Sequence, residues 1–448
     1  NWKSICRDYP EGEISRVVRE DPTIPGLLYV GSETGIFFST NDGVNWSQLG
    51  GNFPVVPVYD LYIKDDEMVV ATHGRSFWIL DDLNPLRESS WIRSEEEFHF
   101  FAPKPSYRRT LNWSTNLFMG DGKNYSPAFG IPGTSYVVED SNGEKQTRFL
   151  DLGENPPQGV IFHYFLNDPE NTKLELQIQD SEGKIIETFE TKQDRQVSQD
   201  QEDEDEDEKK PNLPATKGLN RFIWNMRYPG PAERIDKSLE KKGYQALGRG
   251  EMGERGGPTA IPGSYHAVLR MENKEQAQSF EILKDPRLDT THDDYQAQFD
   301  LWLRIRDRLS ETNHLLNRLR RLRSEISIIL QRPDQTKDHS DNSSKSFRDS
   351  AESLLQKLDE LENELFQTRN ETPSDRLRHP VKLRDRLEGL ISVVAVAEAS
   401  PPRQAFEVFE HLSGLLEKHF SRMNQLESNE LVTLKQLVHK EKIQMFEG

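Results

Sequence analysis

Residues 39–46 constrain the fold of this chain more than any other segment. They read Ser-Thr-Asn-Asp-Gly-Val-Asn-Trp, which is the pattern Ser-x-Asn/Asp-x-Gly-x-x-Trp. Asn and Asp side chains bond to nearby backbone groups in turns, and Gly accepts a positive φ without steric cost. The Ser ends one strand and the Trp opens the next. The segment therefore predicts a β-hairpin with a structural turn made by Ser39, Asn41, Asp42, Gly43 and Trp46.

The same ending occurs a second time, near the start of the chain. Residues 1–5, Asn-Trp-Lys-Ser-Ile, parallel residues 45–49, Asn-Trp-Ser-Gln-Leu. A repeat of about 44 residues is typical of one blade of a β-propeller. We therefore expect this chain to be the C-terminal part of a longer protein, with further N-terminal blades missing. A signal peptide would belong to that missing part.

Composition limits the possible partners. The chain has 448 residues and a net charge of −19, which argues against nucleic acid or an anionic membrane as a partner, because both require a basic face. The single cysteine, Cys6, provides neither a disulfide framework nor a pair of zinc ligands. We see no apolar stretch long enough to span a membrane. No motif indicates a cofactor or a metal site.

Residues 1–103 have the strand spacing of a partial β-propeller of about two blades. Short apolar runs separated by Gly-containing turns predict two four-stranded blades. The strands of the first are 14–18, 27–30, 36–39 and 46–49. Those of the second are 58–63, 68–72, 76–80 and 98–102.

Residues 104–288 predict an immunoglobulin- or fibronectin-like β-sandwich. Six strand-like runs carry this expectation: 160–166, 174–178, 185–190, 219–226, 265–270 and 279–283. Two polar inserts, near 192–212 and 230–258, contain too little apolar surface to fold and are expected to be disordered. The acidic run Glu202–Glu208 lacks the spaced ligands of a calcium loop, so a solvated linker is the preferred interpretation.

Residues 289–448 predict an α-helical bundle, because the hydrophobic period changes from two to 3.6. Apolar stripes mark four helices, at 293–329, 351–365, 383–394 and 406–420, and a short last helix at 431–437. Thr291 is the expected N-cap of the first helix. The simplest interpretation of such a bundle is a structural domain whose helices only pack against one another.

Several motifs together resemble a known family. They are Leu28–Gly35, Tyr59–Leu61 and Ala71–Leu83 in the first region, and Lys217–Arg227, Pro262–Tyr265 and Asp285–Arg287 in the second. These segments are similar to the closing blades, and the sandwich after them, of bacterial sortilin-type Asp-box (BNR-repeat) β-propeller proteins. The turn at residues 39–46 resembles the Asp-box itself, with Asn41 in place of the usual Asp.

The resemblance implies an exported protein, extracellular or periplasmic. Members of this family are commonly labelled glycosyl hydrolases or sortilin-like proteins, and that label rests largely on the shared repeat. Three functions stay open. The chain is part of a propeller that binds a peptide or a polysaccharide at its mouth, or part of a glycoside hydrolase whose catalytic carboxylates lie mostly in the missing blades, or a purely structural region.

Alternating strand direction brings four candidate ligand-binding residues to one face. Glu33 and His73–Arg75 belong to equivalent turns of adjacent blades, and Asp60 begins an inner strand. We therefore expect Glu33, Asp60, His73 and Arg75 to lie opposite the Asp-box turn. Two carboxylates with a His and an Arg could bind a polar ligand or perform acid–base chemistry.

The same residues also have a structural interpretation, in which Arg75 and Glu33 form an ion pair between blades and His73 stabilises its own turn. The catalytic residues stay unknown. Hydrolases of this kind need aromatic platforms, and only Tyr59, with Phe77 or Trp78, is available on this face. This favours binding over catalysis.

Overall fold

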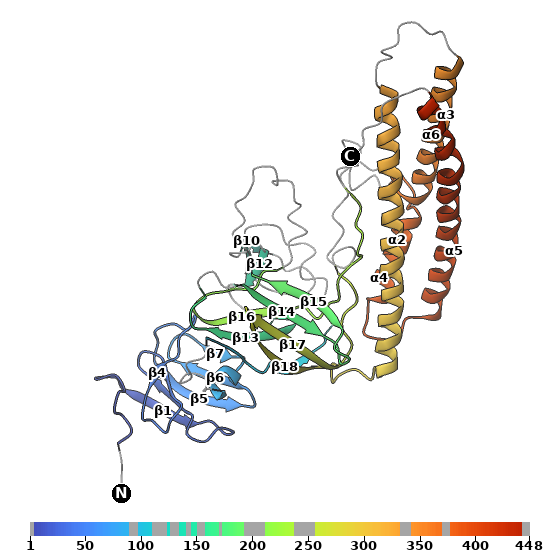
Figure 1. Cartoon of the computed structure of the whole chain (residues 1–448). Coiled ribbons are helices and arrows are strands. Elements are labelled where there is room, and N and C mark those ends of the chain that lie inside the picture. Colours follow the sequence, from blue (N-terminus) through green and yellow to red (C-terminus); the bar gives the residue numbers. More distant parts are fainter. Residues whose placement is uncertain are drawn as a thin grey trace. The chain divides into compact units, whose positions relative to one another are not determined.

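The computed structural model describes residues 4–88, 97–109, 123–125, 134–139, 145–149, 157–169, 173–191, 211–236, 256–331, 342–369 and 377–440. The acidic run, most of both expected inserts and Trp2 lie outside these residues. The protein combines several β-sheets with a C-terminal helical region, as expected at this coarse level (Figure 1). It divides into two compact units, one made of residues 1–226 and 262–285 and one made of 227–261 and 286–448.

Unit 1 begins with a four-stranded antiparallel sheet in chain order. Its strands are β1 (Ser15–Glu20), β2 (Leu28–Ser32), β3 (Ile36–Ser39) and β4 (Ser47–Gln48). The four strands predicted for this part of the chain are therefore confirmed, with ends that differ by one or two residues.

The turn between β3 and β4 has the hydrogen bonds that its sequence predicts. The Ser39 hydroxyl accepts the Gly43 N–H at 2.9 Å, and the Asn41 side-chain oxygen accepts the Asn45 N–H at 2.9 Å. Asp42 and Gly43 have φ values of 56° and 76°, the left-handed conformation that Asn, Asp and Gly tolerate best. Trp46 is half-buried, and its indole N–H donates to the Ile5 carbonyl at 2.8 Å.

A second sheet follows, with three strands and not the expected four. It contains β5 (Val58–Lys64), β6 (Glu67–Thr72) and β7 (Phe77–Leu80). The prediction that 98–102 closes this sheet is wrong. After β7 the chain turns into a short helix, α1 (Asn84–Arg87), and the strand β8 (Phe98–Phe100) pairs with β13 (Val160–Leu166) in another sheet.

The first two sheets share one apolar core. Tyr29 and Ile36 from the first sheet and Leu61, Val70 and Met68 from the second are all at most 2% exposed. The sheets approach closely at Gly31, where an added Cβ would lie 2.6 Å from the Val58 Cγ1 atom. Only glycine permits this approach, since a methyl group there would overlap the valine.

Two further sheets complete the described core of unit 1. One has the order β16 (Gly218–Trp224), β13 (Val160–Leu166), β8. The other has the order β15 (Ile185–Glu190), β14 (Leu174–Gln179), β17 (Gly263–Met271), β18 (Lys274–Leu283), β9 (Ser106–Tyr107). Aromatic rings join them: the Phe280 ring contacts Phe162 at 5.4 Å and Trp224 at 6.1 Å between centroids. A small sheet of β10 (Lys123–Tyr125), β11 (Thr134–Glu139) and β12 (Lys145–Phe149) is also present.

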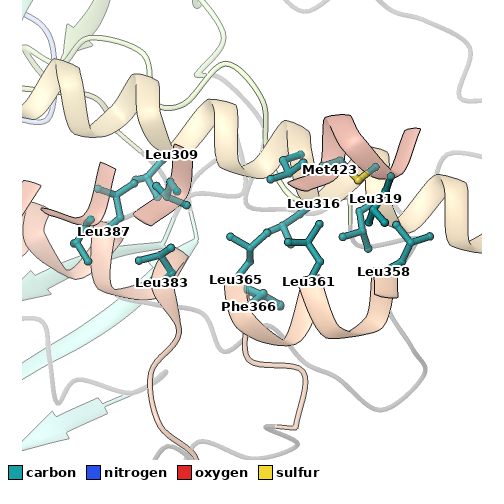
Figure 2. Close-up of a cluster of buried hydrophobic side chains, with 14 of the residues drawn as sticks. Leu309, Leu316, Leu319, Leu358, Leu361, Leu365, Phe366, Leu383, Leu387 and Met423 are labelled. Carbon is teal, nitrogen blue, oxygen red and sulfur yellow. The ribbon is translucent and has the colours of Figure 1, made fainter. Parts of the chain in front are cut away.

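Unit 2 is helical, as the change of period predicts. Its helices are α2 (His292–Gln331), α3 (Asn342–Leu365), α4 (Leu383–Val394), α5 (Arg403–Gln425) and α6 (Val432–Lys440), with a π-helical turn at Leu426–Leu431. Thr291 caps α2, because its hydroxyl accepts the Asp294 N–H while the Asp294 carboxylate accepts the Thr291 N–H. Leucines from several helices form the core (Figure 2).

The change of region expected at residue 288 lies close to the end of one stretch of unit 1, at residue 285, and unit 2 also includes an earlier segment. Residues 227–261 belong to unit 2, although most of them fall in an insert that was expected to be disordered. Two buried asparagines of α2 hold the described part of this segment. Asn313 donates to the Glu233 carbonyl at 2.9 Å, and Asn317 donates to the Arg234 carbonyl at 2.6 Å. The described residues before 237 are therefore held against α2 by hydrogen bonds from its side chains to their backbone carbonyls.

The close contact under the β3–β4 turn gives a first prediction. In Gly43→Ala the new methyl group would lie 2.8 Å from Ile5 Cβ at a φ of 76°. We expect a loss of about 2–3 kcal/mol in the free energy of unfolding of unit 1. Gly74→Ala is the matched control, since Gly74 has a φ of 89° and open space around it, and it should cost about 1 kcal/mol. Equal costs in urea denaturation followed by tryptophan fluorescence would show that the turn does not rest on Ile5.

A buried ion pair in unit 2 gives a second prediction. The side chains of Arg320 and Glu362 are 3% and 4% exposed and are bonded at 2.7 Å. Glu362→Ala leaves Arg320 buried without this partner and should destabilise unit 2 by about 3–5 kcal/mol. Glu364→Ala, on the same helix but 52% exposed, should cost less than about 1 kcal/mol. Thermal unfolding followed by circular dichroism at 222 nm compares the two, and a cost for Glu362→Ala as small as that of Glu364→Ala would contradict the buried pair.

Candidate functional site

The strand registers place the four candidate residues at one end of the first two sheets. Gly31 pairs with Ile36 beside the turn that holds Glu33, whereas Leu28 pairs with Ser39 beside Asn41. Glu33 and Asn41 therefore lie at opposite ends of β3. In the second sheet, Thr72 pairs with Val58, so the turn with His73 and Arg75 lies beside the start of β5. We call this end of the two sheets the Glu33 edge.

A chain of contacts crosses the Glu33 edge from the first sheet to the second. The Glu33 carboxylate forms an ion pair with Arg16 of β1. The Arg16 guanidinium carbon lies 5.3 Å from the centroid of the Tyr59 ring, within the range of a cation–π interaction. Tyr59 in turn stacks on His73, with centroids 5.1 Å apart and an interplanar angle of 9°. Glu33, Arg16, Tyr59 and His73 thus form one continuous polar and aromatic surface.

Tyr59 has its position because of a β-bulge. The β5–β6 register shifts between Val58 and Asp60, so Tyr59 lacks a direct partner on β6. A bulge bends a strand and redirects the side chain of the extra residue. Tyr59 is 49% exposed, so part of this residue is accessible to a ligand.

Asp60 joins the two sheets through a second arginine. Arg19 of β1 donates to the Asp60 carboxylate at 2.6 Å and to the Leu61 carbonyl at 3.0 Å. Both candidate carboxylates, Glu33 and Asp60, are therefore bonded to arginines of β1. These pairs are partly exposed, and each contributes little to stability by itself.

The expected alternative, an Arg75–Glu33 pair, is not formed, because Glu33 binds Arg16. The Arg75 backbone N–H donates to the Thr72 hydroxyl at 3.1 Å, which fixes the turn. Among the described residues, no hydrogen-bond acceptor or carboxylate engages the exposed Arg75 guanidinium. Arg75 is the candidate cation still able to bond an acidic or polar group of a ligand.

The other two aromatic candidates point elsewhere. Trp78 packs on Phe53 with ring centroids 5.4 Å apart, and its N–H donates to the Arg75 carbonyl at 3.0 Å. Phe77 is 74% exposed on the outer face of the second sheet. Tyr59 is the aromatic residue of this group whose contacts with Arg16 and His73 form part of the Glu33 edge.

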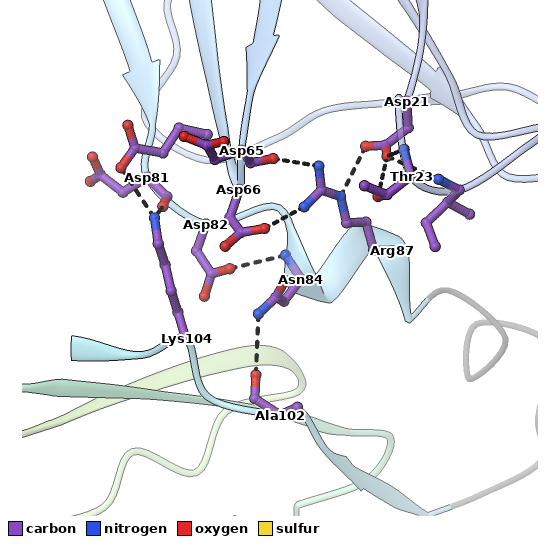
Figure 3. Close-up of polar contacts among 12 residues, drawn as sticks. Asp21, Thr23, Asp65, Asp66, Asp81, Asp82, Asn84, Arg87, Ala102 and Lys104 are labelled. Atoms are coloured by element: carbon purple, nitrogen blue, oxygen red, sulfur yellow. Dashed lines mark hydrogen bonds and ion pairs between the residues drawn. The ribbon is translucent and has the colours of Figure 1, made fainter. Parts of the chain in front are cut away.

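The opposite end of the two sheets is fixed by Arg87 of α1 (Figure 3). Its guanidinium donates to Asp21 at 3.0 Å, to Asp66 at 2.6 Å and to the Asp65 carbonyl at 2.6 Å. Asp21 follows β1, and Asp65 and Asp66 form the β5–β6 turn. One side chain thus connects both sheets at the end remote from the Glu33 edge.

Asp21 is the most enclosed member of this cluster, with a fully buried side chain. Burial alone would raise the pKa of its carboxyl, but hydrogen bonds from Thr23 and Ile24 and the contact with Arg87 outweigh burial and lower the pKa. Tyr29 also donates its hydroxyl to Asp21, at 3.1 Å. The charged carboxylate therefore stabilises this end of the two sheets.

Asp81 and Asp82 follow β7 in the same region. Asp82 accepts the Asn84 N–H at 2.9 Å and lies 3.3 Å from His163 of β13, so it caps the turn that follows β7. Burial raises the pKa of Asp81, and the nearby Glu67 carboxylate adds to this effect. Lys104 bonds Glu67 at 3.1 Å and the Asp81 carbonyl at 3.2 Å.

Both candidate carboxylates are engaged by arginines of β1: Glu33 pairs with Arg16 and Asp60 with Arg19. In the part of the chain that the structure describes, no three His, Cys, Asp or Glu residues are grouped to hold a metal ion. None of the helices described there combines the length and the apolar character that crossing a membrane requires.

Sequence reasoning missed the arginines that organise both ends. Arg16 and Arg19 lie on β1 and Arg87 lies on a helix too short to show a hydrophobic period. Ser15–Glu20 reads Ser-Arg-Val-Val-Arg-Glu, and this pattern gives no local signal for the partners of its arginines. Pairing across 17 to 66 positions of sequence cannot be read from such a local pattern.

The lowered pKa of Asp21 gives a third prediction, on the pH dependence of stability. A carboxyl whose folded-state pKa lies below its unfolded value, about 3.9, contributes stability above that value and loses it as the pH falls through the folded-state pKa. Between pH 5 and 2.5, wild type should therefore lose roughly 1 kcal/mol more of its free energy of unfolding than Asp21→Asn does. Asp60→Asn, at an exposed pair, should follow the wild-type profile. Parallel profiles for wild type and Asp21→Asn in urea titrations would contradict the assignment.

Comparisons with protein-family models, with curated proteins and with solved structures find no match for this chain.

Proposed function

We propose that this chain is part of an exported β-propeller protein of the Asp-box type and that it binds a peptide or glycan ligand at the Glu33 edge. In this proposal the first two sheets are blades of the propeller. The β16–β13–β8 sheet and the β15–β14–β17–β18–β9 sheet form an accessory β-sandwich, and unit 2 is an accessory helical bundle. The observation that carries the proposal is the surface Glu33–Arg16–Tyr59–His73, together with Arg75, whose guanidinium no described residue engages.

The chemistry of this surface suits a polar ligand with an apolar face. An exposed tyrosine stacked on a histidine offers a flat platform for a sugar ring or a peptide side chain. Arg75 supplies a fixed positive charge, and His73 supplies ring nitrogens that can donate or accept a hydrogen bond. Such a combination of a few polar groups around an aromatic platform is typical of ligand sites.

The hydrolase alternative has less support, because the arginine pairs engage both carboxylates. A propeller typically has four to eight blades, so two sheets leave most of its mouth to further blades of the same protein. Those blades would supply the remaining contacts and any catalytic carboxylates. Export to the periplasm or the extracellular space is proposed on the same resemblance.

Binding is tested with the chain itself and two panels of probes. One panel contains neutral and uronic-acid-containing oligosaccharides, and the other contains short acidic and neutral peptides. We expect at least one probe to bind, and Tyr59→Ala to weaken it about tenfold, which corresponds to roughly 1.4 kcal/mol and to the loss of one stacked ring. The matched control is Tyr107→Ala, which removes a tyrosine 44% exposed elsewhere in unit 1, with Arg109 over its ring.

Arg75→Ala separates a ligand contact from a structural role. Because no described residue engages its guanidinium, this variant should weaken the same probe about tenfold and leave the melting temperature within about 1 °C of wild type. Two results would overturn the proposal: no probe binds, or Arg75→Ala lowers the melting temperature while binding is intact.

A further inference from the structure

Residues 229–236 lie along one face of α2. This segment belongs to unit 2 and forms neither helix nor strand. The α2 side chains that contact it are spaced three or four positions apart, which places them on the same side of a helix. We call them the asparagine row: Arg306, Ser310, Asn313, Asn317 and Arg321.

The asparagine row bonds mainly to the backbone of the segment. The Ser310 hydroxyl accepts the Glu233 N–H at 2.9 Å. Asn317 donates to the Arg234 carbonyl at 2.6 Å and to the Glu233 carboxylate at 2.7 Å, and its side-chain oxygen accepts the Asp236 N–H at 2.8 Å. Backbone groups are the same in every peptide, so bonds of this kind can hold a segment of another polypeptide equally well.

The helical bundle itself fixes the orientation of Asn313. Arg384 of α4 donates to the side-chain oxygen of Asn313 at 2.9 Å, which leaves the amide nitrogen directed at the Glu233 carbonyl. The side chains of Asn313 and Asn317 belong to residues that are 1% and 3% exposed. A site whose donors are held in advance loses little conformational entropy when it binds a peptide.

Burial alternates along the segment. Pro231 is buried and Glu233 and Ile235 are half-buried, whereas Ala232 and Arg234 are exposed. A period of two is that of an extended chain, so the odd-numbered residues turn toward the protein. The Ile235 side chain packs against the leucine core of the bundle. These inward-facing residues specify which side chains the site accepts.

Basic side chains of α2 lie beside the two acidic residues of the segment. His314 Nδ1 lies 4.0 Å from the Glu233 carboxylate, and the Arg321 guanidinium lies 3.9 Å from the Asp236 carboxylate. Opposite charges at the rim of a site favour the matching partner over others. The site therefore suits a peptide with one acidic residue two positions before an aliphatic residue and another directly after it.

We infer that the asparagine row is a binding site for extended acidic peptides, which residues 229–236 fill in cis and a peptide of another polypeptide with the pattern Pro-x-Glu-x-Ile-Asp fills in trans. Pro231 and Ile235 are the apolar side chains that anchor the cis segment, and water can replace its polar contacts. A segment with few buried apolar contacts opens locally at a lower cost than global unfolding. This site is separate from the Glu33 edge and does not depend on the ligand proposed there.

A labelled peptide with the sequence of residues 229–236, blocked at both ends, tests the site by fluorescence anisotropy with the full chain. The triple variant Pro231→Ser/Glu233→Ser/Ile235→Ser removes the inward-facing side chains of the cis segment. It should bind the peptide at least about tenfold more tightly than wild type, because a tethered segment competes at an effective concentration of about a millimolar. The matched control Ala232→Ser/Arg234→Ser changes outward-facing residues and should bind as weakly as wild type.

Two further changes test which groups make the contact. Asn317→Ala, added to the triple variant, should weaken peptide binding at least about tenfold, because its hydrogen bonds to the peptide are lost. A peptide carrying Glu233→Gln and Asp236→Asn should bind the triple variant severalfold more weakly than the acidic peptide. Circular dichroism at 222 nm checks that each variant is folded.

Hydrogen exchange of the wild-type chain tests the opening of the cis segment and does not depend on whether the triple variant folds. We expect the amides of Glu233 and Asp236 to exchange at least about 100-fold faster than the amide of Leu316 in the middle of α2. Three results would overturn the inference: a folded triple variant that binds no tighter than wild type, binding that Asn317→Ala leaves unchanged, or amides of Glu233 and Asp236 as protected as that of Leu316.

Discussion

The arrangement of the first two sheets depends on one buried guanidinium group. Arg87 binds Asp21 at the end of β1 and Asp66 in the β5–β6 turn, so α1 holds both sheets at the end remote from the Glu33 edge. A buried charge of this kind is stabilising only when its partners are held in good geometry. Here Thr23 and Tyr29 hold Asp21. The cluster therefore restricts how the two sheets can slide past each other.

The surface at the Glu33 edge follows from that restriction. Arg16 and Arg19 come from β1, whereas Tyr59 and Asp60 come from β5, and their contacts form only when the sheets are aligned. These exposed pairs are too weak to impose the alignment. The close approach of Gly31 to Val58 and the Arg87 cluster impose it, and the polar groups are thereby positioned in advance for a ligand.

Local pattern predicted most strands and helices of this chain, because each has a clear hydrophobic period or a specific turn. The β3–β4 turn is the best case, since Ser39, Asn41 and Gly43 leave little choice of conformation. Local pattern does not predict which strand pairs with which. Phe98–Phe100 looks like any buried strand, and only the register with Tyr164, Phe165 and Leu166 shows which sheet it joins.

The expectation of disorder for residues 230–258 left out one kind of contact, which the structure shows for the described residues before 237. Its few apolar residues predict disorder, yet Asn313 and Asn317 of α2 hold its backbone. Polar side chains that bind a distant backbone leave no periodic signal in either segment. Of the candidate site, the sequence allowed the placement of Glu33, Asp60, His73 and Arg75 at one end of the sheets. It could not show that Arg16, and not Arg75, pairs with Glu33.

A double-mutant cycle between Arg87 and Asp21 tests the central claim most directly. The free energy of unfolding of unit 1 is measured for wild type, Arg87→Leu, Asp21→Ala and the double variant. If Arg87 aligns the two sheets through Asp21, each single change is costly and the coupling energy is at least about 2 kcal/mol. Additive costs, within about 0.5 kcal/mol, would contradict the account and would mean that the apolar core alone sets the position of the two sheets.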